Sequence, residues 1–309
     1  MNSGDDKPVL LVGAGAAGIS AALWLQDFDV AFDWIAIDPK PGGILRKVHN
    51  SIENYPGGFF ADGPALADSM ANHLQSIELQ PRQARLTNVV TDKSTLRCVI
   101  DDATEHRPTF LLLATGTEYR RLGVPGEKQG LHKWISQSAT ADAPRFAGRH
   151  VAVVGGGDSG LENALILSQH DCRITLLLRS PELKARPAFI DAIDDDPAIS
   201  IAPMPSVVKR IERSDEGCRL HVDQQGQPVT YDVAALFVRI GVDPIIPSGC
   251  EELERDDRGF LVVDPDGRSS RPEIYAVGDV IATPLRSVAT AVGGGARAAR
   301  AIAVELGKF

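Results

Sequence analysis

Val9-Leu10-Leu11-Val12-Gly13-Ala14-Gly15-Ala16-Ala17-Gly18 is the stretch of sequence that decides the expected fold. An apolar run passes into three glycines spaced Gly-x-Gly-x-x-Gly, small residues follow, and a second apolar run ends at Asp38. This order predicts a strand, a helix and a second strand parallel to the first. In such a unit the first glycine permits a tight turn, the second lets the backbone approach a pyrophosphate, and the third lets the helix pack closely on the strand.

Asp38 supplies the remaining part of this pattern. Its carboxylate closes the second strand at the distance where an acid binds the hydroxyls of a ribose, and the N-terminus of the intervening helix attracts phosphate. A glycine triplet alone often marks only a tight turn, but here the strand, the helix and the terminal acid occur together. The sequence therefore predicts a dinucleotide site. The residues predicted to form it are Gly13, Gly15, Ala16, Ala17, Gly18 and Asp38.

The same pattern of strand, glycine turn and helix returns 142 positions later, counted from Gly13 to Gly155 (155 − 13). The second strand of this copy ends in Arg179 instead of an acid. Arginine pairs with a ribose 2′-phosphate, which an acid would repel, so this copy favours NADPH. Lys184 and Arg186 follow, and they either add positive charge to the same site or belong to a solvated basic loop.

Glycine-rich turns also stand at the ends of other predicted strands. Residues 40–45 contain a Gly-Gly pair, and residues 52–58 are too rich in Pro and Gly for a regular helix. Two further apolar runs end in Ala114-Thr115-Gly116 and in Gly278-Asp279. Glycine at the end of a buried strand places the backbone beside a bulky neighbour. We interpret residues 52–58 as the lining of a flat ring system, with a surface loop as the alternative.

The amino-acid composition restricts the type of protein that the chain can be. The chain has 309 residues, of which 43% are hydrophobic and 24% charged, which is typical of a soluble globular protein with room for two domains. A net charge of −9 disfavours nucleic acid or an anionic membrane as the main partner. No apolar run approaches the roughly 18 residues of a membrane span, and the polar residues 1–6 do not resemble a secretory signal. We therefore expect a cytoplasmic protein.

The sulfur and imidazole side chains are dispersed along the sequence. The four cysteines stand far apart without a Cys-x-x-Cys pair, at positions 98, 172, 218 and 250. Free buried thiols are the expectation for each of them. The seven histidines lack the spacing of metal ligands, so no metal site is predicted.

Taken together, these motifs resemble the low-molecular-weight thioredoxin reductases and their relatives, two-domain flavoproteins of class II of the pyridine nucleotide-disulfide oxidoreductases that carry FAD and NADPH. The resemblance covers nearly the whole chain. It implies an α/β fold with two Rossmann-like, three-layer nucleotide-binding domains, the second inserted into the first. The FAD-binding domain is expected over residues 1–117 and 243–309, with a helix opening at Pro284 and running through Glu305, and the NAD(P)H-binding domain over residues 118–242. A homodimer is also implied.

The resemblance assigns further site residues by position. In addition to the first glycine turn and Asp38, the expected FAD site comprises Gly43, Ile44, Leu45, Asn54, Ala114, Thr115, Gly116, Gly278, Asp279, Arg286, Ser287 and Val288. The expected NADPH site comprises Gly155, Gly157, Asp158, Ser159, Gly160, Glu162, Arg179 and Lys184. Ser287 replaces the usual glutamine of the family. Of the family's His-Arg-Arg-x-x-x-Arg only Arg179 is kept, with Ser180 and Lys184 at the other basic positions, so NADH stays an alternative to NADPH.

One departure from the family concerns its redox centre. Members with disulfide activity carry Cys-Ala-Thr-Cys-Asp where this chain has Ser138-Ala139-Thr140-Ala141-Asp142. A hydroxyl and a methyl group cannot form a disulfide, because a thiolate is the required nucleophile. Relay through a dithiol at this place is therefore excluded, whether the loss is natural or introduced. Asp142, with Ser138 beside it, is the candidate catalytic residue, as a proton donor near the flavin.

We therefore expect an FAD-dependent NAD(P)H oxidoreductase whose electrons go to an unidentified acceptor, a small molecule or a small redox protein. Three alternatives stay open. A ferredoxin or flavodoxin reductase also lacks the cysteine pair, but that branch usually carries a C-terminal extension over the flavin, and this chain ends at Phe309 soon after its last expected helix. The others are a flavin-binding protein without turnover and a disulfide reductase whose two cysteines were substituted.

Overall fold

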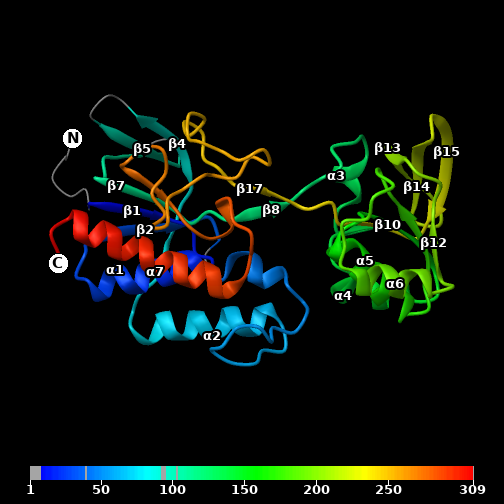
Figure 1. Ribbon diagram of the computed structural model, residues 1–309, viewed down its shortest axis with the longest axis horizontal. Coiled ribbons are helices and arrows are strands. Elements are labelled where there is room, and N and C mark those ends of the chain that lie inside the picture. The colour runs from blue at the N-terminus through cyan, green and yellow to red at the C-terminus, as the bar shows by residue number, and fades with distance from the viewer. Residues whose placement is uncertain (1–7, 39, 92–94, 102–103, 309) are drawn as a thin grey trace. The chain divides into compact units, whose positions relative to one another are not determined.

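The computed structural model describes residues 8–38, 40–91, 95–101 and 104–308 (Figure 1). The N-terminal residues that carried the expectation about a secretory signal lie outside this part. The chain divides into two compact units, one formed by residues 1–118 and 243–309 and the other by residues 119–242. The second unit is thus an insertion in the first. Each unit is an α/β structure of three layers.

A five-stranded parallel sheet forms the centre of the first unit. Its strands, in spatial order, are β18 (Ile274–Ala276), β7 (Phe110–Leu113), β1 (Val9–Val12), β2 (Phe32–Ala36) and β3 (Arg82–Gln83). Strands β1 and β7 are buried along their whole length and contain only apolar residues, as a parallel sheet covered on both faces requires. The two predicted strands that begin and end the nucleotide unit are confirmed, although β2 ends two residues before Asp38.

Helices cover one face of this sheet, and a small antiparallel sheet covers the other (Figure 1). The helices are α1 (Ala16–Asp27), α2 (Gly63–Ser76) and α7 (Val288–Glu305). The antiparallel strands are β4 (Leu86–Thr91), β5 (Leu96–Ile100) and β6 (Thr104–His106). Helices α1 and α7 pack so closely that a Cβ at Gly295 would lie 2.3 Å from the carbonyl oxygen of Ala17. The two predominantly apolar cores, one on each face, hold the three layers together.

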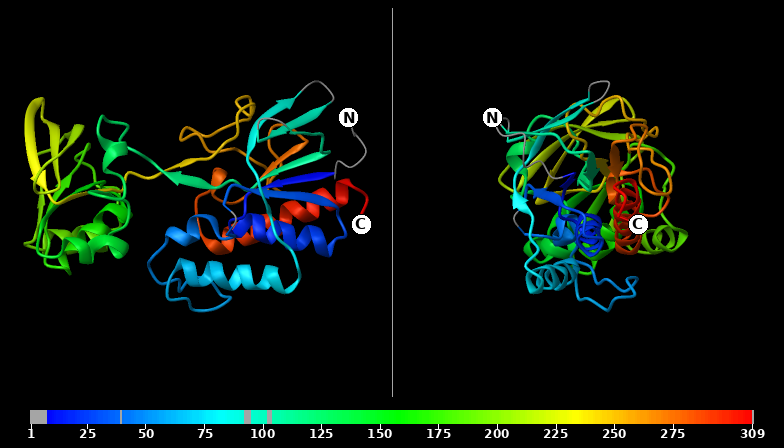
Figure 2. Two further views of the ribbon diagram at one scale, coloured as in Figure 1. Left: turned by 180° about the vertical axis from the view of Figure 1, so that it is seen from behind. Right: turned by 90° about the vertical axis from the view of Figure 1, so that its left-hand side faces the viewer.

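The second unit repeats this arrangement (Figure 2, left). Its parallel sheet has the order β12 (Ile199–Ile201), β11 (Arg173–Leu177), β10 (His150–Val154), β16 (Ala235–Val238) and β9 (Ile135–Ser136). The helical layer contains α4 (Ala139–Asp142), α5 (Asp158–Ser168) and α6 (Pro187–Asp194). The opposite layer is the antiparallel sheet of β13 (Ser206–Arg213), β14 (Cys218–Gln224) and β15 (Gln227–Val233).

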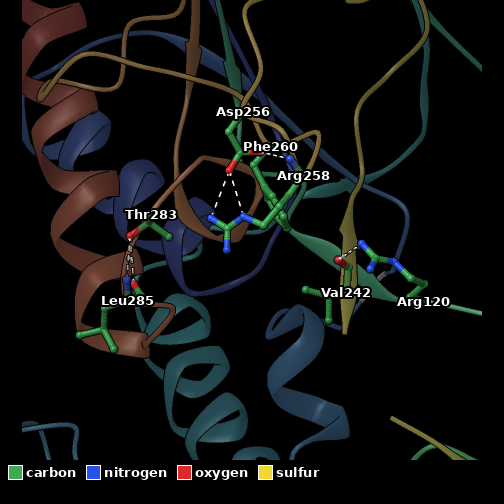
Figure 3. A network of polar contacts seen from close by, with 7 residues as sticks. All are labelled: Arg120, Val242, Asp256, Arg258, Phe260, Thr283 and Leu285. Atoms are coloured by element: carbon green, nitrogen blue, oxygen red, sulfur yellow. Dashed lines mark hydrogen bonds and ion pairs between the residues drawn. The ribbon is translucent and has the colours of Figure 1, made fainter. Parts of the chain in front are cut away.

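The chain passes between the two units along β8 (Thr117–Tyr119) and β17 (Val242–Pro244), which pair with one another. The backbone N–H of Arg120 donates to the carbonyl oxygen of Gly241 at 3.0 Å, and that of Ile245 to Gly116 at 2.9 Å, so the pairing is antiparallel. The Arg120 guanidinium adds a 3.3 Å bond to the carbonyl oxygen of Val242 (Figure 3). The remaining short elements are α3 (Glu127–Gly130) and three 3-10 turns, Gly43–Lys47, Ala143–Phe146 and Gly278–Val280.

The last helix begins later than expected. Helix α7 starts at Val288 and not at Pro284, so that boundary was wrong. The cause is a capping box, since the Ser287 side chain accepts the N–H of Thr290 and the Thr290 hydroxyl accepts the N–H of Ser287, each at 3.2 Å. Residues 284–286 therefore remain irregular and lead into the helix.

Candidate functional site

A cavity of about 510 Å³ lies in the first unit, above the carboxyl ends of β1, β2 and β7. Ligands bind in open parallel sheets at this edge. Turns distant in sequence meet here, and the predicted residues among its lining are Gly13, Gly15, Ala16, Ala17, Asp38, Gly43, Ile44, Leu45, Asn54, Ala114, Thr115, Gly116, Gly278, Asp279, Arg286, Ser287 and Val288. Sequence reasoning missed other lining residues, among them Lys40, Val48, Thr117, Ile245 and Ala291.

The first glycine turn has the geometry that its spacing predicts. Gly13 has φ +111°, and a Cβ there would lie 2.2 Å from the carbonyl oxygen of Ala114. Gly15 faces open space, with no atom within 4 Å of a Cβ built on it, so a ligand can reach its backbone. Gly18 is the one residue of the predicted FAD set that does not line the cavity. Its Cβ would lie 2.1 Å from the carbonyl oxygen of Gly13, so Gly18 permits close packing of helix and turn.

Asp279 and Arg286 place opposite charges in the wall of the same cavity. Burial raises the pKa of the Asp279 carboxyl, and the positive charge of Arg286 opposes that rise. Burial likewise lowers the pKa of the Arg286 guanidinium. The Nε and Nη2 atoms of Arg286 are buried and have no hydrogen-bond acceptor within the described residues. A buried charged donor without an acceptor is unfavourable, and a ligand in the cavity can supply that acceptor.

Arg286 rests on an aromatic side chain that sequence reasoning did not identify. Its guanidinium carbon lies 3.9 Å from the ring centroid of Phe260, a residue with 2% exposure. Asp256 fixes this loop, since its carboxylate accepts the N–H groups of Arg258 and Phe260 and also the Arg258 guanidinium (Figure 3). The hydrogen-bonded loop thus places Phe260 against the guanidinium of Arg286, which lines the cavity. The sequence signal was weak, because the contact joins residues far apart in the chain.

The glycine turn of the second unit follows the same geometry as the first. Gly155 has φ +139°, and a Cβ there would lie 2.1 Å from the carbonyl oxygen of Arg239. A Cβ at Gly160 would lie 2.1 Å from the carbonyl oxygen of Gly155, whereas Gly157 faces open space. The predicted residues Asp158, Ser159, Gly160 and Glu162 lie in the first turns of α5, directly after this turn. Arg179 and Lys184 are exposed on the loop that follows β11.

The match to a family model covers residues 7–295, and the description of that family is pyridine nucleotide-disulphide oxidoreductase. The chain belongs to this family. It is 32% identical over 300 residues to the thioredoxin reductase of Treponema pallidum, which covers 96% of each chain. It is also 32% identical over 304 residues to the thioredoxin reductase of Streptomyces clavuligerus, covering 96% of this chain and 92% of that protein.

Solved structures agree with the assignment. The thioredoxin reductase of Lactococcus lactis in its FR conformation superimposes with a TM-score of 0.79 at 27% identity, covering 97% of this chain and 99% of that one. A bacillithiol disulfide reductase from Bacillus cereus, at 16% identity and a TM-score of 0.75, shares the fold. This oxidoreductase is therefore FAD-dependent and uses NAD(P)H, as the sequence predicted.

The cavity of the first unit fits FAD on observations of its own. The buried donors of Arg286 lack an acceptor, and FAD carries phosphate and carbonyl oxygens that can serve as one. The space beside Gly15 leaves room for a pyrophosphate at the N-terminus of α1. Asp38 lines the cavity at the end that follows β2, although its Oδ1 also accepts the N–H of Lys40 at 2.9 Å. We expect the residues around Arg286 and those around Asp38 to hold opposite ends of the cofactor.

In this oxidoreductase, hydrogen bonds hold the turn at residues 138–142, to which the resemblance assigns the redox centre. Ser138 is the N-cap of α4, and its hydroxyl accepts the N–H of Ala141 at 3.3 Å. The buried N–H of Ala139 donates to Oδ1 of Asn163 at 2.7 Å. Asp142 accepts the Ser136 hydroxyl at 2.7 Å and forms an ion pair with Arg145 at 2.9 Å. Both carboxylate oxygens of Asp142 are therefore engaged within the unit.

Arg239 holds the same segment from the neighbouring strand. Its Nη1 donates to the carbonyl oxygen of Gln137 at 2.7 Å, and its guanidinium carbon lies 4.7 Å from the ring centroid of Tyr119. Arg239, directly after β16, is thus held by contacts within its own unit. The turn before Ser138 is fixed by hydrogen bonds that need no sulfur.

None of the four cysteines offers a reactive thiol in the folded chain. All four are free and buried, as expected. Burial raises the pKa of the Cys98 and Cys218 thiols to about 12, and that of Cys250 to about 11. Burial also raises the pKa of Cys172. A thiol in this state is a poor nucleophile at neutral pH, because only the thiolate attacks a disulfide.

Two further features concern metals and membranes. Among the described residues, no group of three or more His, Cys, Asp or Glu side chains is arranged to hold a metal ion. No helix in the described ranges combines the length and the apolar character that crossing a bilayer requires.

Proposed function

We propose that this oxidoreductase oxidises NADPH and delivers the two electrons to an acceptor outside its own chain, with no internal dithiol in between. FAD supplies the redox chemistry, since it takes a hydride from a nicotinamide and releases the electrons in pairs or singly. An acceptor that takes up two electrons and two protons consumes one NADPH and one proton, whereas two one-electron acceptors consume one NADPH and release one proton. The homologous thioredoxin reductases support the class of reaction, but they do not identify the electron acceptor of this chain.

One observation carries the proposal. The resemblance to the family assigns Ser138 and Ala141 to the two positions of its cysteine pair, and hydrogen bonds from their own unit hold that segment. The cysteines that the chain does have are buried in hydrophobic cores. An acceptor must therefore take electrons at the cofactor.

The chain's own residues bind and orient in this scheme. We assign Arg286 to an acceptor oxygen of FAD, because its buried donors have no partner among the described residues, and Asp279 to the hydroxyl groups of the same cofactor. Arg179 and Lys184 are assigned to the 2′-phosphate of NADPH, on charge and on their place after β11. Asp142 as a proton donor remains a prediction, and it would first have to leave Arg145 and Ser136.

A small redox protein is the second candidate for the acceptor. The named relatives are thioredoxin reductases, so a protein partner of that size suits the family. Without a dithiol, the reaction with such a partner would have to occur by direct electron transfer at the flavin. We also propose that the chain forms a homodimer and acts in the cytoplasm, in line with the family.

The test starts with anaerobic titration of the purified protein. We expect NADPH to bleach the flavin absorbance with a stoichiometry of one, and NADH to do so less readily. Ferricyanide, quinones, ferredoxin, flavodoxin and thioredoxin with a dithiol reporter are then added to the reduced protein. We expect rapid reoxidation by at least one direct acceptor and none by thioredoxin. A flavin that neither nucleotide bleaches would refute the proposal in favour of a binding protein without turnover.

Restoring the cysteines separates a lost dithiol from a different acceptor. We expect the double variant S138C/A141C to form a disulfide, since both positions lie on one short helical turn. The matched control is S138C alone, which has only one thiol at this place. Full thioredoxin reductase activity in the double variant, together with no activity of the unaltered chain toward any direct acceptor, would contradict the proposal and identify a disulfide reductase with substituted cysteines.

A further inference from the structure

The loop from Arg179 to Arg186 lies against the glycine turn of the second unit. The backbone N–H of Lys184 donates to the carbonyl oxygen of Gly156 at 2.8 Å, and Lys184 forms a β-bridge with Gly157. A Cβ built on Gly156 would lie 3.2 Å from a methyl carbon of Leu183. Backbone contacts at Lys184 thus hold this loop, which carries Arg179 and Lys184, against the glycine turn.

A second tie holds the end of this loop. The carboxylate of Asp158 accepts the backbone N–H of Arg186 at 2.7 Å through Oδ1, and the Nε of the same arginine at 2.8 Å through Oδ2. The guanidinium also lies 4.6 Å from the ring centroid of Phe189, on helix α6, whose N-cap is Arg186. Asp158 therefore binds both the backbone and the side chain of one residue, 28 positions away.

This ion pair has little to contribute to overall stability. The two side chains are 70% and 43% exposed, and pairs of this kind contribute about 0–1 kcal/mol. The ion pair matters more for the charge at the expected pyrophosphate site than for stability. Asp158 lies in the first turn of α5, where the pyrophosphate of a dinucleotide is expected, and an unpaired carboxylate there would repel the ligand. Pairing with Arg186 neutralises this carboxylate and turns it toward the loop.

We propose that Asp158 and Arg186 form a positioning latch that sets the preference of the second unit for a 2′-phosphorylated dinucleotide. The latch holds the loop against the glycine turn, so that Arg179 and Lys184 remain beside the ribose. Arg186 acts as the latch, because Asp158 accepts both its backbone N–H and its Nε. This inference rests on the proposed function, since it presumes that the second unit binds NADPH.

The test measures binding of NADP⁺ and NAD⁺ to the full-length, flavin-loaded protein by isothermal titration calorimetry, independently of turnover. For D158A we expect about a tenfold rise in the Kd for NADP⁺ and less than about a threefold rise for NAD⁺, because charge-assisted bonds to the 2′-phosphate lose their fixed geometry. R186A should act in the same direction. The double variant D158A/R186A should have a Kd for NADP⁺ no higher than that of the more weakly binding single variant, because the two residues act as one pair.

The matched control is R219A. Arg219 and Asp232 form a bidentate ion pair in the same unit, at 2.9 and 2.8 Å and with 49% and 37% exposure, on the antiparallel sheet. We expect R219A to change neither Kd. Binding of 2′,5′-ADP and 5′-AMP to each variant then locates the effect, since only the first ligand carries a 2′-phosphate.

Other outcomes overturn the latch. If D158A binds NADP⁺ as well as or better than the unaltered protein, Arg186 is a phosphate ligand that Asp158 restrains. Equal affinity of the unaltered protein for NADP⁺ and NAD⁺ also refutes the latch, while the proposed function stands. Failure to bind either nucleotide refutes the proposed function itself and the latch with it.

Discussion

Replacement of Arg286 by Met should weaken FAD binding while leaving the apoprotein at least as stable as before. The unaltered side chain buries two N–H donors without an acceptor among the described residues. Each such donor costs about 1–3 kcal/mol in the absence of a ligand. The stacking on Phe260 at 3.9 Å offsets this by about 0.5–2 kcal/mol. Met keeps the apolar contact with the ring and removes both donors.

The expected size of the effect follows from the bonds that FAD would make. A hydrogen bond to a charged donor contributes about 1.5–3 kcal/mol, so loss of one such bond raises the Kd for FAD by about tenfold to a hundredfold. Apoprotein is prepared at low pH or in chaotropic salt, and FAD is titrated back while flavin fluorescence is recorded. Urea unfolding of the apoprotein measures its stability without the cofactor.

The control is Arg258→Met. Arg258 also stacks on Phe260, at 5.5 Å, but it pairs with Asp256 and does not line the cavity. We expect this variant to keep the affinity for FAD within about threefold, because no cofactor bond is lost. An unchanged Kd in R286M, or an apoprotein clearly less stable than the unaltered one, would refute the assignment of Arg286 to the cofactor.

Three further outcomes follow from the site. Gly13→Ala should abolish FAD retention and destabilise the chain by about 1–3 kcal/mol, since the new Cβ would lie 2.2 Å from the carbonyl oxygen of Ala114 at a φ of +111°. The flavin content and the urea unfolding of the purified variant measure these effects. A variant that keeps its full flavin content would contradict the prediction. Burial raises the pKa of Asp279 in the folded apoprotein, so its contribution to stability is present below its unfolded pKa and is lost as pH rises through the folded pKa. Asp279→Asn should therefore stabilise the apoprotein at neutral pH, with a gain that shrinks on acidification; unfolding curves across a pH series measure it, and a gain independent of pH would count against it. A thiol reagent should label no cysteine in the native chain and four after denaturation, and rapid native labelling would show that a thiol is accessible.

Local motifs could be predicted from the sequence, and long-range contacts could not. The glycine turns followed from spacing, because the first and third glycine of each motif lie against a backbone carbonyl oxygen, while the middle glycine faces open space. The start of α7 was placed four residues early, because Ser287 and Thr290 cap the helix and Pro284 does not. The capping pair was visible in the sequence as Ser-x-x-Thr, and proline at a first helical turn was the competing signal.

The support for Arg286 lay beyond this kind of reasoning. Phe260 and Asp256 come from a loop without periodicity, and only the folded chain brings that loop beneath the arginine. The same holds for Asp158 and Arg186, whose pairing depends on how the loop after β11 returns to the glycine turn. Arg186 was expected either as a ligand or as a solvated charge, and its observed partner is an acid that the motif alone does not bring into contact with it.

Because β8 and β17 form an antiparallel ladder, the inserted unit can be removed from the first unit by deletion in the gene. The exit and the return of the chain are hydrogen-bonded neighbours, from Gly116 and Ile245 at one end to Arg120 and Gly241 at the other. A two-residue hairpin turn spans such a ladder, so the codons for residues 119–242 can be exchanged for a short Asn-Gly linker. The remaining polypeptide would keep its sheet intact, and the excised piece would begin and end at adjacent points.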